Sequence, residues 1–223
     1  MINQIATEAE DAAFARTALL QWFGHSARQF PWRYDTNPYH VLIAEMMLRR
    51  TQARQVAPVY KEFLRKFPDV RSLHLAANDD VRATLYPLGL KWRAENFKAL
   101  ANELTVRFQG ELPHTRRELL SLPGIGPYVA DAIRCFAYGE TVTLADTNTV
   151  RVAARYFGFD YNAESRRKPQ VVDAVTQLIE PESPVSANYA LLDFAAQICR
   201  AASPLCSQCP LASRCNYFCV RQA

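Results

Sequence analysis

Glycine is scarce in this sequence, with 7 in 223 residues, and sustained alternation of apolar and polar residues is almost absent. A protein built from half-buried β-strands would show that alternation. Alanine and leucine are abundant instead, and the apolar residues recur at helical spacing. The sequence therefore predicts an all-α fold.

Long apolar runs are also missing, and none approaches the roughly 20 residues that span a bilayer. The first twenty residues carry acidic side chains where a secretory signal carries basic ones, and no small-residue cleavage site follows. We therefore expect a cytoplasmic protein without a membrane partner, associated with the nucleoid if its partner is DNA.

The net charge of +4 is mildly basic, which favours a polyanionic partner without deciding for one. The arginines are more informative because they gather in short groups. Solvated helix faces would explain such groups equally well as a nucleic-acid surface. The groups are Arg49, Arg50 and Arg54; Arg116 and Arg117; Arg151 and Arg155; and Arg166, Arg167 and Lys168.

Helical periodicity and end signals divide the chain into segments without a repeat or a low-complexity linker. Gly24 is expected to end the first helix, Gly139 to stop the helix that starts at Pro127, and residues 201–218 to form a loop-rich tail. The first expected helix covers residues 8–22. The others cover residues 38–48, 53–66, 79–85, 91–108, 115–121, 146–157, 169–179 and 186–198.

A short glycine-containing turn joins two of these helices at Leu122-Pro123-Gly124-Ile125-Gly126-Pro127-Tyr128. Because Gly124 and Gly126 have no side chains, backbone N–H groups of the turn and of the next helix can approach a phosphate closely. Such a contact anchors DNA by its backbone without reading its sequence. The alternative is an ordinary turn between two helices.

Two carboxylates, Asp146 and Glu45, are candidates for catalysis. Asp146 precedes an amphipathic helix, so it fits an N-cap, and the helix start would also keep it ionised. A fixed carboxylate stabilises the positive charge that builds on a sugar when an N-glycosidic bond breaks. Glu45 interrupts an apolar run and is expected to be at least half buried. It would bind or protonate a flipped base, or form a structural ion pair with an arginine.

Four of the six cysteines have the spacing C-x6-C-x2-C-x5-C: Cys199, Cys206, Cys209 and Cys215. Without a signal peptide they are expected to remain thiols, and four thiolates this close can surround one metal centre. Both a [4Fe-4S] cluster and tetrahedral zinc accept four cysteines. Zinc ribbons usually show two C-x2-C pairs, so the spacing favours the cluster. Cys135 is interpreted as a buried helix residue.

Taken together, these residues resemble the helix-hairpin-helix glycosylase superfamily, which includes endonuclease III and the adenine and thymine mismatch glycosylases. The resemblance spans nearly the whole chain, and four motifs occur in the same order. They are Pro31-Trp32 with the run from Glu45 to Gln52, the hairpin from Leu122 to Gly126, Asp146 with Asn148 and the segment 150–152, and the four-cysteine loop.

The resemblance implies two helical lobes with a DNA groove between them. Residues 30–140 would form a six-helix barrel containing the helix-hairpin-helix, and residues 1–29 with 141–223 would form the lobe bearing the [4Fe-4S] loop. The target base would swing out into a pocket between the lobes. We expect a monomer acting on double-stranded DNA with a mismatched or damaged base.

The same resemblance assigns roles to individual residues. Asp146 would be the catalytic carboxylate, held by Asn148. Arg49 or Arg50 would plug the gap left by the flipped base, Leu90 would press into the opposite strand, and Gln52 belongs to the same DNA-binding run. Gly124 and Gly126 would hold the phosphate.

Tyr128 separates the branches of the family. Lyases of the endonuclease III type have a lysine at this position, which forms a Schiff base with the sugar. Tyrosine instead resembles the thymine mismatch glycosylases, in which the ring can stack on the extruded base. We therefore expect a monofunctional glycosylase that removes thymine or uracil opposite guanine. The alternatives are an adenine glycosylase acting opposite 8-oxoguanine, a non-catalytic DNA-binding module and an iron-sulfur redox protein.

The cluster assignment makes a direct prediction. Protein purified anaerobically should be brown, with broad absorbance near roughly 400 nm and about four irons per chain. Absorption spectroscopy and metal analysis measure both properties. A colourless protein with stoichiometric zinc would contradict the assignment.

Overall fold

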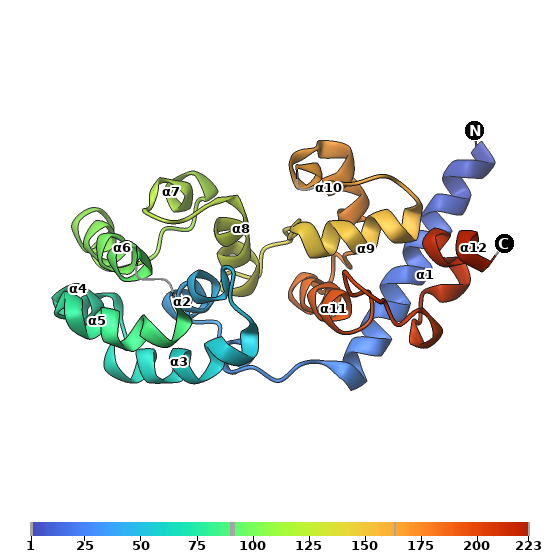
Figure 1. Ribbon diagram of the computed structural model, residues 1–223. Helices are drawn as coiled ribbons and strands as arrows, with labels where there is room; N and C mark the ends of the chain where they lie inside the picture. The colour runs from blue at the N-terminus through green and yellow to red at the C-terminus, as the bar shows by residue number, and fades with distance from the viewer. Residues whose placement is uncertain (1, 90–91, 163, 223) are drawn as a thin grey trace. The chain divides into compact units, whose positions relative to one another are not determined.

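The structure, a computed structural model, describes residues 2–89, 92–162 and 164–222, with side chains for 9–89, 94–162 and 164–221. Over these residues it contains helices and no strand (Figure 1). The all-α fold predicted from the sequence is confirmed.

The helices follow one another through short connections. The α-helices are α1 (Ile2–Ser26), α2 (Pro38–Leu48), α3 (Ala53–Lys66), α4 (Val70–Leu75), α5 (Asn78–Leu85), α6 (Trp92–Phe108), α7 (Arg116–Ser121), α8 (Pro127–Phe136), α9 (Thr147–Phe157), α10 (Pro169–Thr176), α11 (Pro184–Gln197) and α12 (Asn216–Gln222). The 3-10 turns are η1 (Pro31–Tyr34), η2 (Tyr86–Leu88), η3 (Ser165–Arg167), η4 (Cys206–Gln208) and η5 (Ala212–Arg214).

The chain forms two compact units. One consists of residues 29–140, and the other combines residues 1–28 with residues 141–223. The first unit therefore contains α2 to α8, and the second contains α1 and α9 to α12.

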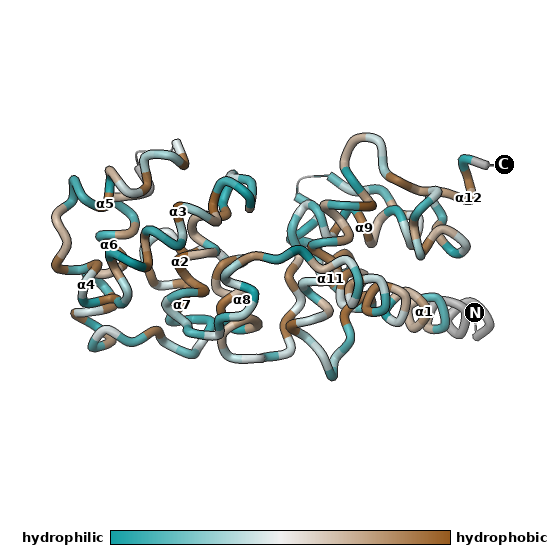
Figure 2. The backbone as a smooth tube through the Cα atoms, turned by 90° about the horizontal axis from the view of Figure 1, so that it is seen from below, coloured by the Kyte–Doolittle hydropathy of each residue, from teal (hydrophilic) through white to brown (hydrophobic). Residues whose placement is uncertain are grey.

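Helix α2 is the centre of the unit formed by residues 29–140. Every residue from 41 to 47 is buried, and Glu45 is the one charged side chain among them; Figure 2 shows how apolar and polar segments alternate along the chain. A helix that is apolar on all sides must be surrounded by other elements, and α3 and α8 both pack against it. Asn37 caps its start by accepting from the amides of Tyr39 and His40, and Pro38 is its first residue.

Helix α9 has the corresponding place in the second unit, where α10, α11 and α12 all contact it. Helix α1 packs along α11, and Trp22 meets Phe194 edge to face with ring centroids 5.5 Å apart. Three cysteines of the tail, Cys199, Cys209 and Cys215, pack against the same apolar core. The tail is therefore docked on the folded unit.

Gly158 ends α9 in the left-handed conformation, with φ of +82°. A Cβ atom at this position would lie only 2.5 Å from Cγ of Asn216, the first residue of α12. The left-handed backbone therefore favours glycine here, and any other residue would also displace the side chain of Asn216.

Three details differ from the sequence-based expectation. Helix α1 continues past Gly24 to Ser26, because a single glycine costs a helix only about 1 kcal/mol. Helix α4 was not expected; it is six residues long and starts with a capping box between Asp69 and Ser72. The tail, expected to be rich in loops, also contains helix α12, which directly follows Cys215.

Lys98 of α6 fastens α4 to the rest of its unit. Its ammonium group donates to the carbonyl oxygens of Leu73 at 3.0 Å, His74 at 2.7 Å and Ala76 at 2.6 Å. The last carbonyls of a helix have no partner within the helix. Lys98 supplies that partner, together with a positive charge at the negative end of the helix dipole.

Replacing Lys98 by methionine should lower the free energy of unfolding by about 2 kcal/mol, because several carbonyl groups lose a charged donor. Urea unfolding followed by circular dichroism measures the change. Lys61→Met on the exposed surface of α3 is the matched control and should change stability by less than about 0.5 kcal/mol. Equal effects of the two substitutions would contradict this role of Lys98.

Candidate active site and DNA-binding elements

The glycine turn lies between α7 and α8, as the sequence predicts. Gly124 has φ of +78°, and a Cβ atom there would lie 3.5 Å from Cε of Met46 and 3.6 Å from Cβ of Asn96. Leu122 and Ile125 on either side are buried. The turn is therefore packed against α2 and α6. Gly126 is the N-cap of α8.

Ion pairs fix the two helices of this hairpin to each other. Asp131 of α8 accepts from Nε and Nη2 of Arg116 at 2.7 and 3.1 Å, and from Arg134 at 3.3 Å. Arg134 also pairs with Glu140. The guanidinium of Arg116 is thus engaged within the protein.

The end of α2 carries the other predicted residues of the same unit. Glu45 is 5% exposed, which confirms the expected burial. Arg49, the C-cap of α2, is exposed, and its Nη1 donates to the carbonyl oxygen of Gly124 at 2.8 Å. Arg50 is exposed and has φ of +58°, a left-handed conformation that is uncommon for residues other than glycine. Gln52 is exposed and forms the N-cap of α3.

Tyr128 is the second residue of α8 and is half-buried. It therefore directly follows the glycine turn on the helix that the turn begins. Leu90, the predicted wedge, lies outside the described residues.

Asp146 is the N-cap of α9 and is half-buried. Its Oδ1 accepts from the backbone amides of Asn148 and Thr149, both at 2.8 Å, and its Oδ2 accepts from Nδ2 of Asn148 at 2.7 Å. Thr149 completes a capping box by accepting from the Asp146 amide. Three donors therefore fix the orientation of the Asp146 carboxylate at the start of α9.

Arg151 connects this pair to the cysteine segment. It is 5% exposed, and its Nη1 donates to Oδ1 of Asn148 at 3.0 Å. Its Nε donates to the carbonyl oxygen of Cys199, and its Nη2 to that of Ala195, both at 3.0 Å. One buried guanidinium therefore joins the start of α9, the end of α11 and the first cysteine of the tail.

Arg155, one helical turn further along α9, holds the next residues of the tail. It donates to the carbonyl oxygens of Arg200 at 2.7 Å and Ala201 at 3.0 Å. Its Nη1 also lies 3.5 Å from Sγ of Cys199, and its guanidinium stacks 4.7 Å from the ring centroid of Tyr217. By sequence, Arg151 and Arg155 form a group that either faces DNA or lies on a solvated helix face. In the structure, both arginines bind backbone carbonyls of the tail or of the end of α11. The one sequence signal for this shared role is their i,i+4 spacing, which places them on the same face of α9.

Cys199, Cys206, Cys209 and Cys215 line one cavity, together with Arg155. Burial, together with the three neighbouring cysteines, raises the pKa of the Cys209 thiol to about 12. Thiolates gathered in this place therefore call for a positive partner such as metal ions. Within the described residues, no three His, Cys, Asp or Glu side chains are placed to hold a single metal ion. A [4Fe-4S] cluster has a different requirement, because each of its irons takes one cysteine.

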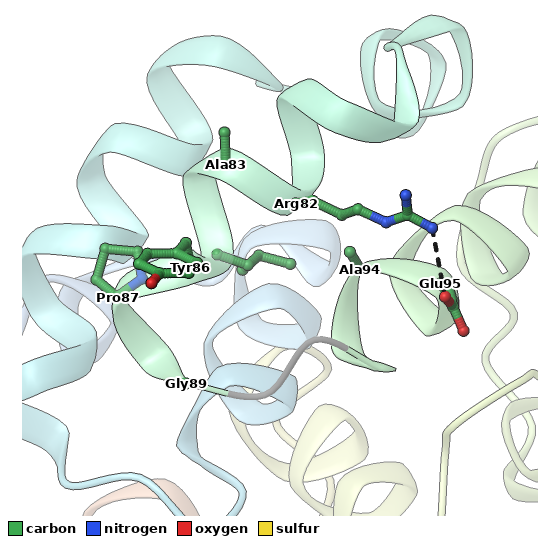
Figure 3. Close-up of a pocket in the computed structure, with 8 residues that line it drawn as sticks. Arg82, Ala83, Tyr86, Pro87, Gly89, Ala94 and Glu95 are labelled. Atoms are coloured by element: carbon green, nitrogen blue, oxygen red, sulfur yellow. Dashed lines mark hydrogen bonds and ion pairs between the residues drawn. The ribbon is translucent and has the colours of Figure 1, made fainter.

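The remaining cysteines lie elsewhere. Cys135 is fully buried in α8, as expected, and Cys219 is exposed. An open cavity of about 830 Å³ lies between α5, η2 and the start of α6 and is lined by Arg82, Tyr86 and Glu95 among others (Figure 3). None of the predicted site residues that the structure describes lines this cavity.

The structure brings the predicted residues together in three groups. Asp146 and Asn148 form one, Arg49 and Gly124 a second, and the four cysteines a third. Glu45 and Tyr128 belong to the unit formed by residues 29–140, whereas Asp146 and Asn148 belong to the other unit.

In the described part of the chain, no helix is both long enough and apolar enough to cross a membrane.

Comparisons with known proteins identify the family. Residues 43–177 match the family described as HhH-GPD superfamily base excision DNA repair protein. This segment covers the glycine hairpin, Asp146 and Arg151. The chain therefore belongs to the HhH-GPD superfamily, as its motifs predicted, and is a DNA glycosylase of base excision repair.

The relatives are similar over almost the whole chain. A thymine/uracil-DNA glycosylase of Pyrobaculum aerophilum is 36% identical over 99% of this chain and 96% of its own length. An adenine DNA glycosylase of Buchnera aphidicola is 32% identical over 90% of this chain but only 57% of its own length. The solved structure of a thermostable thymine-DNA glycosylase superposes with a TM-score of 0.88 at 30% identity, covering 94% of this chain and 97% of the other.

The buried position of Arg151 gives a stability prediction. Arg151→Met should lower the free energy of unfolding by about 2–3 kcal/mol, because two carbonyl oxygens and the Asn148 side chain lose a buried charged donor. It should also speed amide hydrogen exchange at residues 146–149 and 199–201.

Arg16→Met is the matched control, since Arg16 donates to the carbonyl oxygen of Gln177 near the surface of the same unit. It should cost less than about 1 kcal/mol and leave exchange at residues 146–149 unchanged. Equal effects of the two substitutions would show that Arg151 does not connect these segments.

Proposed function

We propose that the protein is a monofunctional glycosylase that hydrolyses the N-glycosidic bond of thymine or uracil mispaired with guanine. The observation that carries the proposal is the carboxylate of Asp146, which three donors hold in place at the start of α9. The similarity to a thymine/uracil-DNA glycosylase over nearly the whole of both chains supports the choice of base.

The chemistry assigned to Asp146 is electrostatic. When the bond between the sugar C1′ and the base nitrogen breaks, its electron pair leaves with the base and positive charge develops on the sugar. A carboxylate that is already oriented stabilises this charge without reorganising. Water then adds its oxygen to C1′, and its proton balances the charge of the departing base. Asn148 is the positioning residue, because its Nδ2 donates to the carboxylate.

Glu45 and Tyr128 are proposed to bind the extruded base. Glu45 is buried, so its carboxyl group would meet a polar edge of the base in a site with little water. The half-buried ring of Tyr128 offers a surface for stacking. The hairpin, residues 121–136, contains no lysine. Nothing on it can form the Schiff base that strand cleavage by a lyase requires.

Binding of double-stranded DNA is assigned to the hairpin and to the end of α2. The first amide groups of a helix have no acceptor within the helix and point toward a bound anion. Helix α8 begins at the packed glycine turn, so Gly124 and Gly126 would let a phosphate reach these amides. Arg50, exposed and in a left-handed conformation, is proposed to plug the gap left by the base. Gln52 and Leu90 would contact DNA beside it. The protein is proposed to act as a monomer.

A [4Fe-4S] cluster is proposed to bind Cys199, Cys206, Cys209 and Cys215, which line one cavity and supply its complete donor set. When bound, the cluster would cross-link the tail covalently. Arg151 and Arg155 would hold the same tail segment through its backbone. In this proposal the cluster has a structural role.

Two alternatives remain as outcomes of the test. Adenine removal opposite 8-oxoguanine is favoured by the similarity to adenine DNA glycosylases, but this chain spans little more than half the length of the Buchnera aphidicola protein. A non-catalytic DNA-binding module would not need the buried carboxylate of Glu45 together with the carboxylate of Asp146.

The proposal predicts base release under single-turnover conditions from duplexes containing G:T or G:U. Strand breaks should appear only after alkali, because the product of hydrolysis is an intact abasic strand. Release of adenine alone, from the duplex with 8-oxoguanine, would establish the alternative. Breaks before alkali would contradict a monofunctional mechanism.

Asp146→Asn tests the mechanism within the same assay. Asparagine caps helices about as well as aspartate, so the fold should survive while the negative charge is lost. The rate should fall about 100-fold or more with DNA binding retained. Asp173→Asn, on an exposed position of α10, is the control and should keep the full rate. An Asp146→Asn variant with the full rate would refute the assigned chemistry.

A further inference from the structure

One contact joins the end of α2 to the turn of the hairpin. Nη1 of Arg49 donates to the carbonyl oxygen of Gly124 at 2.8 Å, across 75 residues of sequence. It links the helix that carries Glu45 to the turn that precedes Tyr128. By sequence, either Arg49 or Arg50 could plug the gap left by the flipped base. In the structure, Arg49 is the one that binds the turn.

Packing at Gly124 leaves some space. A Cβ atom added there would make only ordinary van der Waals contact with Met46 and Asn96. Contacts at Gly124 therefore do not fix the distance between the turn and α2 by themselves, and the Arg49 bond does so. A hydrogen bond from a charged donor is stronger than one from a neutral donor. The position of the turn therefore depends on this side chain.

Arg50 has a different geometry. Its backbone is left-handed whereas that of Arg49, with φ of −60° and ψ of 115°, is extended. Both residues lie in the short connection between α2 and α3. Two neighbouring arginines in such different conformations are not interchangeable.

We propose that Arg49 is a positioning residue of the phosphate-binding turn and acts equally on damaged and undamaged DNA, whereas Arg50 is the one of the two arginines that acts at the lesion. This inference rests on the proposed function, because it divides the DNA-binding work of that site between two residues. The guanidinium of Arg49 also brings a positive charge to the turn itself, where a phosphate would be bound.

The test compares Arg49→Gln with Arg50→Gln. Arg71→Gln, at an exposed position of α4, is the control for the loss of one positive charge. Dissociation constants for undamaged and G:T duplexes are measured at one fixed ionic strength, because phosphate contacts make affinity depend on salt. Base release is measured at saturating and at subsaturating enzyme. Amide hydrogen exchange of residues 122–130 is measured in the free protein.

Arg49→Gln should raise Kd for both duplexes by a similar factor of about 3–10, a loss of roughly 1 kcal/mol. Amide exchange in the turn should become faster, and base release at subsaturating enzyme should slow by about the same factor as Kd rises. Arg50→Gln should slow base release from G:T at least about tenfold and leave exchange in the turn unchanged. Arg49→Lys, which keeps a charged donor, should restore slow exchange.

Two outcomes would overturn the inference. One is unchanged exchange in the turn of Arg49→Gln, which would show that the bond does not position it. The other is slow base release at saturating enzyme with undamaged-duplex affinity equal to that of Arg71→Gln, because Arg49 would then act at the lesion. If Arg49→Gln fails to fold, the same measurements on Arg49→Met and the amide hydrogen exchange of Arg49→Lys test the role of Arg49. A wild-type protein that releases no base would refute the proposed function, while the exchange and undamaged-DNA measurements would still decide the role of Arg49.

Discussion

The N-cap of α9 is the interaction on which the proposed chemistry depends. The Asp146 carboxylate accepts two backbone amides that the helix itself leaves without partners. The bonds that start the helix are therefore the same bonds that orient the carboxylate. Its orientation comes from secondary structure, which is rigid, and not from a mobile loop.

Further hydrogen bonds extend this support through the unit. Asn148 donates to Oδ2 of Asp146, Arg151 donates to Asn148, and the same guanidinium donates to the carbonyl oxygen of Cys199. A buried charge is costly unless it has hydrogen-bond partners. Each of the three guanidinium nitrogens of Arg151 has an acceptor, so one group holds the start of α9, the end of α11 and the cysteine tail.

In the unit formed by residues 29–140, α2 combines two tasks. Its middle is buried on every side and determines how α3 and α8 pack around it. Its end is exposed and carries Arg49 and Arg50. A central helix that ends at the surface places its last residues accurately, because the packing of the whole helix fixes their position.

The sequence predicted most of the helices, the glycine turn, the cap at Asp146 and the burial of Glu45, because each has a local signal. Periodicity marks helices, glycine marks left-handed turns, and a carboxylate before an amphipathic helix marks a cap. The roles of Arg49, Arg151 and Arg155 could not be predicted, because their partners lie 44 to 75 residues away in the chain. An arginine that binds a backbone carbonyl leaves no trace in the composition of that partner. Short α4 was missed because its cap pairs Asp69 with a serine in place of glutamate or glutamine.

The contact between Gly158 and Asn216 has a consequence for substitutions in this unit. A Cβ atom added at position 158 would lie 2.5 Å from Cγ of Asn216, so the exposed Asn216 side chain would have to turn away from α9. A shorter residue at position 216 would remove this conflict and leave only the strain of the left-handed backbone. The effects of substitutions at positions 158 and 216 should therefore not be additive, although 58 residues separate them.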